Sequence, residues 1–338
     1  MSDIRPVGPA HPETEQDAPA DAQVTAVGVP EAPPLQERPE QPDAVPVKPK
    51  GRRDKPASLW SDAWYDLRRR PLFLGASVLI AVLLVMAIFP QLFTSIDPYD
   101  AKTCVLANAR QDISAAHWFG TDNQGCDVYA RTIYGARNSI VVGVSTTVVT
   151  ALVGGLLGLI AGFRSGATDT LLSRTTEIFF AIPPILGALL ILAMFRTGNV
   201  WTVMLALAVL AWPMTFRIMR AAVITAKNQD YVMAARALGA GPWRIMFRHI
   251  LPNSIAPVIV VATINLGSFI AAEAALSFLG VGIRSPDISW GLMIAEARDR
   301  FLEAWEPLLF PAFMLSLTVL AFIMLGDAVR DALDPKLR

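Results

Sequence analysis

The sequence predicts an all-α integral membrane protein with six transmembrane helices behind a polar N-terminal tail. Of the 338 residues, 53% are hydrophobic and only 17% are charged, and the mean hydropathy is +0.44. This composition is too apolar for an ordinary soluble domain. Six apolar runs are long enough to cross a bilayer, because a helix needs about 20 apolar residues to span roughly 30 Å of hydrocarbon.

The same composition argues against two other classes of protein. Basic and acidic residues balance at 29 each, so no bulk positive field indicates a nucleic-acid partner. The three histidines, His11, His117 and His249, lie far apart, and two cysteines cannot form a four-thiolate zinc site. We therefore expect no nucleic acid, no metal site and no cofactor in this chain.

Residues 1–56 form a proline-rich, acidic segment with almost no aromatic residues. Such a segment cannot bury enough apolar surface to offset the entropy of ordering, so we expect a disordered cytoplasmic tail. It has no apolar run behind a basic start, which argues against a cleaved signal peptide. The rest divides into a juxtamembrane segment with the first span (57–93), an extracytoplasmic loop (94–137) and a core of five spans (138–338).

The predicted spans follow the apolar runs, at 71–93, 138–163, 171–195, 200–223, 255–279 and 307–329. In the second span Gly154, Gly158 and Gly162 recur every four residues, which predicts a stripe where a neighbouring helix packs closely. The pair Pro183 and Pro184 is expected to kink the third span, because proline removes a backbone donor and crowds the preceding turn. A role of either feature in shaping a transport pathway is the alternative.

Basic residues predict the orientation of these spans. They gather before the first span, in the loops 164–170 and 224–254, and after residue 329. Cationic segments resist translocation, so both termini and these loops are expected to be cytoplasmic. The opposite segments carry at least as many acids as bases, and tryptophans stand near the expected interfacial belt at positions Trp201, Trp290 and Trp305.

The cytoplasmic loop 224–254 carries more helical signals than a simple connector needs. Asp230 is placed to cap a short helix that Gly239 or Gly241 ends, and a second helix is expected to begin at Pro242. Small side chains would make the first helix narrow enough for a partner's groove, and nearby arginines would hold it by charge-assisted bonds. The docking residues predicted here are Tyr231, Ala234, Ala235, Arg236, Leu238, Gly239 and Arg244. The alternative is an interfacial loop that is helical because alanine favours helix.

Five stretches of sequence resemble one family of transporters. "AARALGAGPWRIMFRHILPN" at 234–253 resembles the EAA loop of ABC-importer permeases. The stretches at 117–143, 274–282, 289–298 and 325–338 are similar to the C-type subunit of the dipeptide and oligopeptide permease group. The resemblance covers nearly everything after Trp60. In one departure, Met233 stands where the family usually has the glutamate of its signature, which removes one salt bridge to the ATPase.

The resemblance implies the type I ABC-importer permease fold in the cytoplasmic membrane of the cell. It implies a second permease subunit as heterodimer partner, two ATP-binding subunits on the cytoplasmic loops, and an extracytoplasmic binding protein that delivers peptide. The chain contains no GxxxxGK[ST] loop to hold nucleotide phosphates. We therefore expect no enzymatic activity in this chain, with ATP and magnesium bound by the partners.

Polar groups in the spans are candidates for the translocation path, because lone ones facing lipid are costly. Asn265 and Glu273 fall in the fifth span, and a buried bond to a neighbouring helix is the alternative role of Glu273. Cys104 and Cys126 share the first outer loop, where we predict a disulfide rather than free thiols. Closing a loop of about twenty residues stabilises a fold by roughly 3 kcal/mol in the chain-entropy model.

Three other functions stay open on the sequence. An ion-coupled secondary transporter also fits six spans, but few intramembrane carboxylates are present to couple ions. A channel or purely structural subunit would not explain the glycine-bounded helices of the loop 224–254. An ABC permease for glutathione, haem or a nickel chelate would share the same architecture, because cargo is selected largely in the separate binding protein.

Overall fold

The computed structural model describes residues 64–65, 67–100, 102–195 and 198–333. Within these ranges the regular structure is helical, apart from one isolated antiparallel bridge between Thr121 and Asp127. All of the described residues belong to one compact unit. The predicted disordered tail, 1–56, lies outside the described residues.

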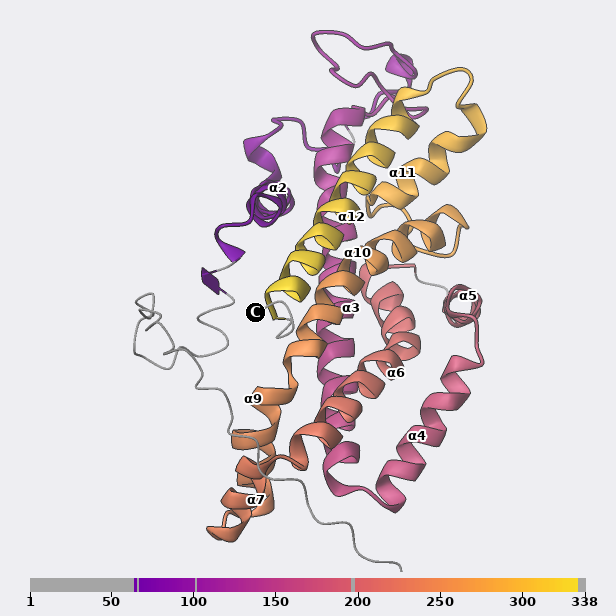
Figure 1. Cartoon of the computed structure of the whole chain (residues 1–338). Helices are drawn as coiled ribbons and strands as arrows, with labels where there is room; N and C mark the ends of the chain where they lie inside the picture. The colour runs from indigo at the N-terminus through magenta and orange to yellow at the C-terminus, as the bar shows by residue number, and fades with distance from the viewer. Residues whose placement is uncertain (1–63, 66, 101, 196–197, 334–338) are drawn as a thin grey trace, which may run out of the picture. The chain divides into compact units, whose positions relative to one another are not determined.

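Five helices are long and apolar enough to cross a membrane. They are α2 (Pro71–Ile88), α3 (Val128–Arg164), α6 (Val200–Lys227), α10 (Ala256–Phe278) and α12 (Glu306–Leu333). These helices coincide with the first, second, fourth, fifth and sixth predicted spans (Figure 1). The predicted all-α, membrane-spanning fold class is therefore confirmed.

The third predicted span, 171–195, is not one kinked helix but a sharply bent pair of helices. Two shorter helices occupy this stretch, α4 (Ala167–Phe180) and α5 (Pro184–Met194), and they meet at an angle of 87°. Pro183 caps α5 in an extended conformation and Pro184 occupies its first turn. Neither proline donates a backbone hydrogen bond, so the expected kink becomes a full break.

Two helix ends differ from the predicted boundaries. The first helix ends at Ile88 rather than near residue 93, because Phe89 precedes Pro90 and leaves the helical conformation. The second begins ten residues earlier than expected, at Val128. The Asp127 side chain accepts a hydrogen bond from the amide of Ala130 and so caps it. The predicted outer loop therefore includes the first turns of α3.

The glycine stripe of α3 is covered by α6, and the two helices lie side by side (Figure 1). A Cβ atom at Gly154 would lie 2.5 Å from the Trp212 carbonyl oxygen, and one at Gly158 would lie 2.6 Å from that of Phe216. Such close backbone approach requires residues without side chains. The stripe is thus the contact between the two helices.

Polar contacts fix the end of this helix pair. The Lys227 ammonium donates to the carbonyl oxygen of Gly162 at 2.9 Å, in the last turn of α3. Arg220 of α6 forms a bidentate ion pair with Asp169 of α4. The two contacts tie α3, α4 and α6 together where the chain enters the loop 224–254.

Trp290 does not belong to an interfacial belt, contrary to the expectation for the three tryptophans. It begins α11 (Trp290–Ala297) and is completely buried. Its indole N–H donates to the carbonyl oxygen of Thr132 at 2.8 Å. By contrast, Trp201 and Trp305 are exposed.

Candidate functional site

A short helix, α7 (Asp230–Ala237), follows α6 at the opposite end of α3 from the loop that precedes residue 128 (Figure 1). Asp230 is not the cap that the sequence predicted. It is the first helical residue, and Gln229 occupies the cap position without a side-chain bond. Gly239 ends the helix, as expected, in the left-handed region with φ of +81°.

One side of α7 is buried against the chain's own second helical segment. Val232 is fully buried and Ala235 is 9% exposed, and Val232 packs in one cluster with Ile245, Met246 and Ile250. Ala235 was predicted as a docking contact, but the structure points it inward. Ala235 therefore faces the chain itself, whereas a docking contact would need an exposed side chain.

The opposite side presents large apolar residues to the outside. Leu238 is 88% exposed and Trp243 is 66% exposed, and the rings of Trp243 and Phe247 stack with centroids 5.7 Å apart. We call this surface the coupling face; its members are Tyr231, Met233, Leu238, Trp243 and Phe247. Single exposed apolar side chains are normal on proteins, but five of them within 17 residues of chain make this segment a candidate interaction site.

The same segment also exposes basic residues. Arg236, Arg244 and Arg248 are all exposed, as is Ala234, so the segment presents both apolar side chains and cations. The sequence prediction missed Trp243 and Phe247. Their spacing of four residues on a helix was the available signal, because it places both rings on one side.

The coupling face is joined to the membrane helices without a flexible break. Pro242 begins α8 (Pro242–Arg244), as predicted, and a π-helical turn at Ile245–Ile250 leads through α9 (Leu251–Ser254) to α10. At its other end α7 is separated from α6 by two residues only. The segment that carries the coupling face is therefore connected to both α6 and α10 by very short links.

A groove of about 420 Å³ opens between α4, α5, α6 and α10. Its wall is mostly apolar, with Phe179, Leu210 and Met214 among the lining residues. Two polar side chains, Asn265 and Ser268, also line it, and both come from α10. The structure thus places the path candidate Asn265 beside an open groove.

Glu273 does not line this groove. Its side chain is fully buried and accepts hydrogen bonds from Ser277 at 2.7 Å, Ser289 at 2.9 Å and Ser139 at 3.2 Å. These serines belong to α10, to the cap of α11 and to α3. Its placement corresponds to the alternative role, a buried bond to neighbouring helices, rather than to a pathway residue.

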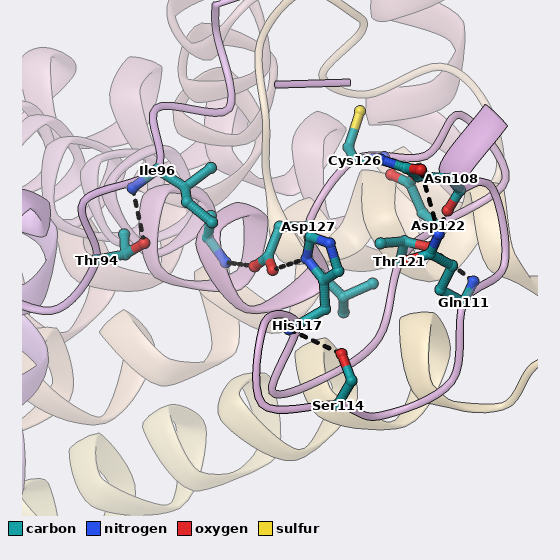
Figure 2. Close-up of polar contacts among 12 residues, drawn as sticks. Thr94, Ile96, Asn108, Gln111, Ser114, His117, Thr121, Asp122, Cys126 and Asp127 are labelled. Atoms are coloured by element: carbon teal, nitrogen blue, oxygen red, sulfur yellow. Dashed lines mark hydrogen bonds and ion pairs between the residues drawn. The ribbon is translucent and has the colours of Figure 1, made fainter. Parts of the chain in front are cut away.

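The loop before α3 is held by polar side chains (Figure 2). Asp122 accepts from the amides of Gln124 and Cys126. Asp122 also pairs with Arg131 of α3, which reaches Glu296 of α11 at 2.8 Å. Ring nitrogen Nδ1 of His117 lies 2.7 Å from the carboxylate of Asp127. The loop is therefore fastened to α3 and α11.

Cys104 and Cys126 are joined by a disulfide in the structure. We predict that the bond forms in the cell, because this loop is expected to face an oxidising compartment. Mass spectrometry of the unreduced protein is expected to show one cross-linked peptide pair. A Cys104→Ser variant is expected to be cleaved several-fold faster by protease within 94–127. Alkylation of both cysteines without reduction would contradict the prediction.

Comparison with known families matches two regions of the chain. Residues 154–338 match the family described as "Binding-protein-dependent transport system inner membrane component". Residues 58–117 match the family described as "N-terminal TM domain of oligopeptide transport permease C". The first match covers the groove and the coupling face, and the second covers α2.

Three similar proteins span nearly the whole chain. The oligopeptide transport system permease protein OppC of Bacillus subtilis is 39% identical over 284 residues, covering 84% of this chain and 92% of that protein. The dipeptide transport system permease protein DppC of Bacillus subtilis is 38% identical, covering 83% and 87%. The glutathione transport system permease protein GsiD of Escherichia coli is 37% identical, covering 88% and 96%.

Among solved structures, the inward-facing MetNI methionine ABC transporter is similar with a TM-score of 0.42 and 22% identity, covering 55% of this chain and 93% of that one. The extent of the family match and the identity to relatives covered over most of their length together establish the family of this chain. The chain is a transport permease, and it belongs to the family of binding-protein-dependent transport system inner membrane components.

Proposed function

We propose that this chain is the permease subunit of an ATP-driven importer of di- or oligopeptides. The observation that carries the proposal is the coupling face, an exposed apolar patch on two short helices that lead directly into α6 and α10. Relatives that span most of the chain are named as oligopeptide and dipeptide permeases. Peptide is accordingly the cargo class that we assign.

In this proposal the coupling face docks on an ATP-binding subunit, of which the complex holds two. Leu238 and Trp243 enter an apolar cleft of that subunit, while Arg236 and Arg244 pair with its acids. Met233 is 55% exposed and adds apolar contact where relatives of the group use a glutamate. Docking of this subunit thus relies more on burial of apolar surface than on a salt bridge.

ATP acts through the partners and needs no nucleotide site in this chain. Nucleotide binding shifts a conformational equilibrium only through its different affinity for the two states. The coupling face must therefore transmit that difference, a few kcal/mol, to the membrane helices. The short links from α7 to α6 and from α9 to α10 make this transmission mechanical. ATP and magnesium are accordingly assigned to the partners, and no catalytic step to this chain.

The groove between α4, α5, α6 and α10 supplies this chain's half of the path. Its mostly apolar wall suits peptide cargo with side chains of varied shape. Asn265 and Ser268 offer hydrogen bonds to the backbone of that peptide. A second permease subunit completes the path as heterodimer partner. The outer loop fastened by Asp122 and Arg131 faces the delivering protein, with both chain termini on the cytoplasmic side.

The test is uptake of a labelled tripeptide by vesicles that hold this chain, its permease partner, the ATP-binding subunits and the binding protein. We expect uptake when ATP is supplied on the side of the membrane that the ATP-binding subunits face. We expect no uptake with a proton or sodium gradient alone. Uptake driven by an ion gradient without ATP would establish a secondary transporter instead.

Glutathione is the second candidate cargo, because one group of relatives is named for its transport. A competition experiment distinguishes glutathione from other di- and oligopeptides as the cargo. Excess unlabelled di- and tripeptides of several sequences are expected to suppress uptake of the labelled tripeptide. Suppression by glutathione alone, with other peptides inactive, would assign glutathione as the cargo.

A further inference from the structure

The segment directly before α2 carries a cluster of aromatic and basic side chains that the proposed function does not use. Its described residues 64–65 and 67–70 precede the first membrane helix. Two contacts hold it against the end of α12. Leu67 is buried in one cluster with Ala328 and Ala332, and Arg70 pairs with Asp331 at 2.8 Å.

These contacts leave four side chains on the outside of the segment. Trp64 is 53% exposed and Tyr65 is 47% exposed. The Arg68 guanidinium lies 5.5 Å from the centre of the Trp64 ring, and that of Arg69 lies 4.0 Å from the Tyr65 ring. Each pair is spaced by four residues, so one face of a helical turn carries both. We call these four residues the headgroup patch.

The cations of the headgroup patch have no acidic partner among the described residues. The charge continues beyond it, because residues 48–70 hold eight basic residues against three acidic ones. A guanidinium over an aromatic ring keeps its N–H groups at the edge available for hydrogen bonds. Its planar fork matches a phosphate group well.

We propose that the headgroup patch binds the phosphate of an anionic phospholipid. Adjacent Leu72 and Leu74, at the start of α2, are 47% and 48% exposed, so apolar surface for the acyl chains continues directly from the cations. Tryptophan and tyrosine favour the membrane–water interface, and basic clusters beside a membrane helix attract anionic lipid. A free phosphate would use the cations but would gain nothing from these apolar neighbours.

The test is native mass spectrometry of the purified full-length chain with equal amounts of phosphatidylglycerol and phosphatidylcholine that carry identical acyl chains. Each basic residue near an anionic headgroup contributes about fivefold in affinity. The unaltered chain is therefore expected to retain phosphatidylglycerol about tenfold or more over phosphatidylcholine. Arg68→Gln with Arg69→Gln is expected to lower that ratio at least several-fold, whereas lysine at both positions keeps most of the preference.

The matched control is Arg164→Gln with Arg174→Gln, which removes two exposed arginines elsewhere and is expected to leave the ratio unchanged. A ratio that persists in the Arg68 and Arg69 glutamine variant, or falls equally in the control, overturns the proposal. So does displacement of the lipid by millimolar inorganic phosphate, which would mark a site for free anions.

A measurement on the unaltered chain decides the matter if the glutamine variant fails to insert. Photoactivatable phosphatidylglycerol is expected to cross-link within 64–74, and cross-links only at other positions would contradict the assignment. Neither readout depends on import activity. Failure of this proposal is therefore distinguishable from failure of the proposed transport function.

Discussion

Gly239→Pro is expected to abolish ATP-driven import while the chain still folds and inserts. Gly239 has φ of +81°, a value that proline cannot adopt because its ring fixes φ near −65°. Its amide also donates to the carbonyl oxygen of Arg236 at 3.0 Å, and proline would remove that bond. The chain would leave α7 in another direction and separate Leu238 from Trp243 on the coupling face.

The fold should tolerate this change because Gly239 is exposed and nothing lies within 4 Å of a Cβ atom placed there. Hydrolysis of ATP is expected to continue at its basal rate, since the motor lies in partner subunits under the proposed function. We expect import to fall more than tenfold while insertion and folded yield stay within twofold of the unaltered chain.

Gly241→Ala is the matched control. Gly241 lies two residues away, is also exposed and open, but has φ of −69°, which alanine adopts without strain. Its import rate is expected to equal that of the unaltered protein. Both variants are measured by peptide uptake and by ATP turnover in the same vesicles. Normal import by the Gly239→Pro variant would refute the role assigned to α7.

Gly158→Leu is expected to destabilise the helix bundle by about 3 kcal/mol or more, because it overpacks a contact between backbones. A Cβ atom at this position would lie 2.6 Å from the Phe216 carbonyl oxygen and 2.9 Å from the Met219 Cβ atom. The carbonyl belongs to the α6 backbone and cannot rotate away as a side-chain end would. The two helices would have to separate, which exposes the whole stripe.

The neighbouring Gly155 provides the control, because no atom lies within 4 Å of a Cβ atom placed there. Gly155→Leu is expected to be neutral or slightly stabilising, since glycine is a poor residue in a helix interior. Thermal unfolding in detergent and the folded fraction after extraction measure both variants. Equal unfolding temperatures for the two leucine variants would show that the stripe is not a tight contact.

Features encoded in short stretches were predictable. The membrane helices follow from apolar length alone, which is why five of the six predicted spans match single helices. The glycine that ends α7 and the proline that begins α8 act through their own backbone restrictions. The family was recognisable from contiguous strings such as 234–253, whose residues share one stretch of chain.

It was harder to predict from the sequence which side chains in those stretches are buried and which are exposed. Both Ala235 and Leu238 fit a short docking helix, yet the structure buries the first and exposes the second. That choice depends on the apolar cluster that includes Ile245 and Ile250, which exists only after the chain has turned back at Gly239. The same turn brings Trp243 to the coupling face.

By itself the sequence determined the class of protein, the number of apolar runs and the family, because these depend on composition and on local strings. Tertiary structure alone decided that the third run breaks at 87° and that Glu273 is enclosed while Asn265 borders a groove. The physical reason is that burial depends on neighbours brought from far along the chain. Ser139, for example, lies 134 residues from the Glu273 carboxylate that it contacts.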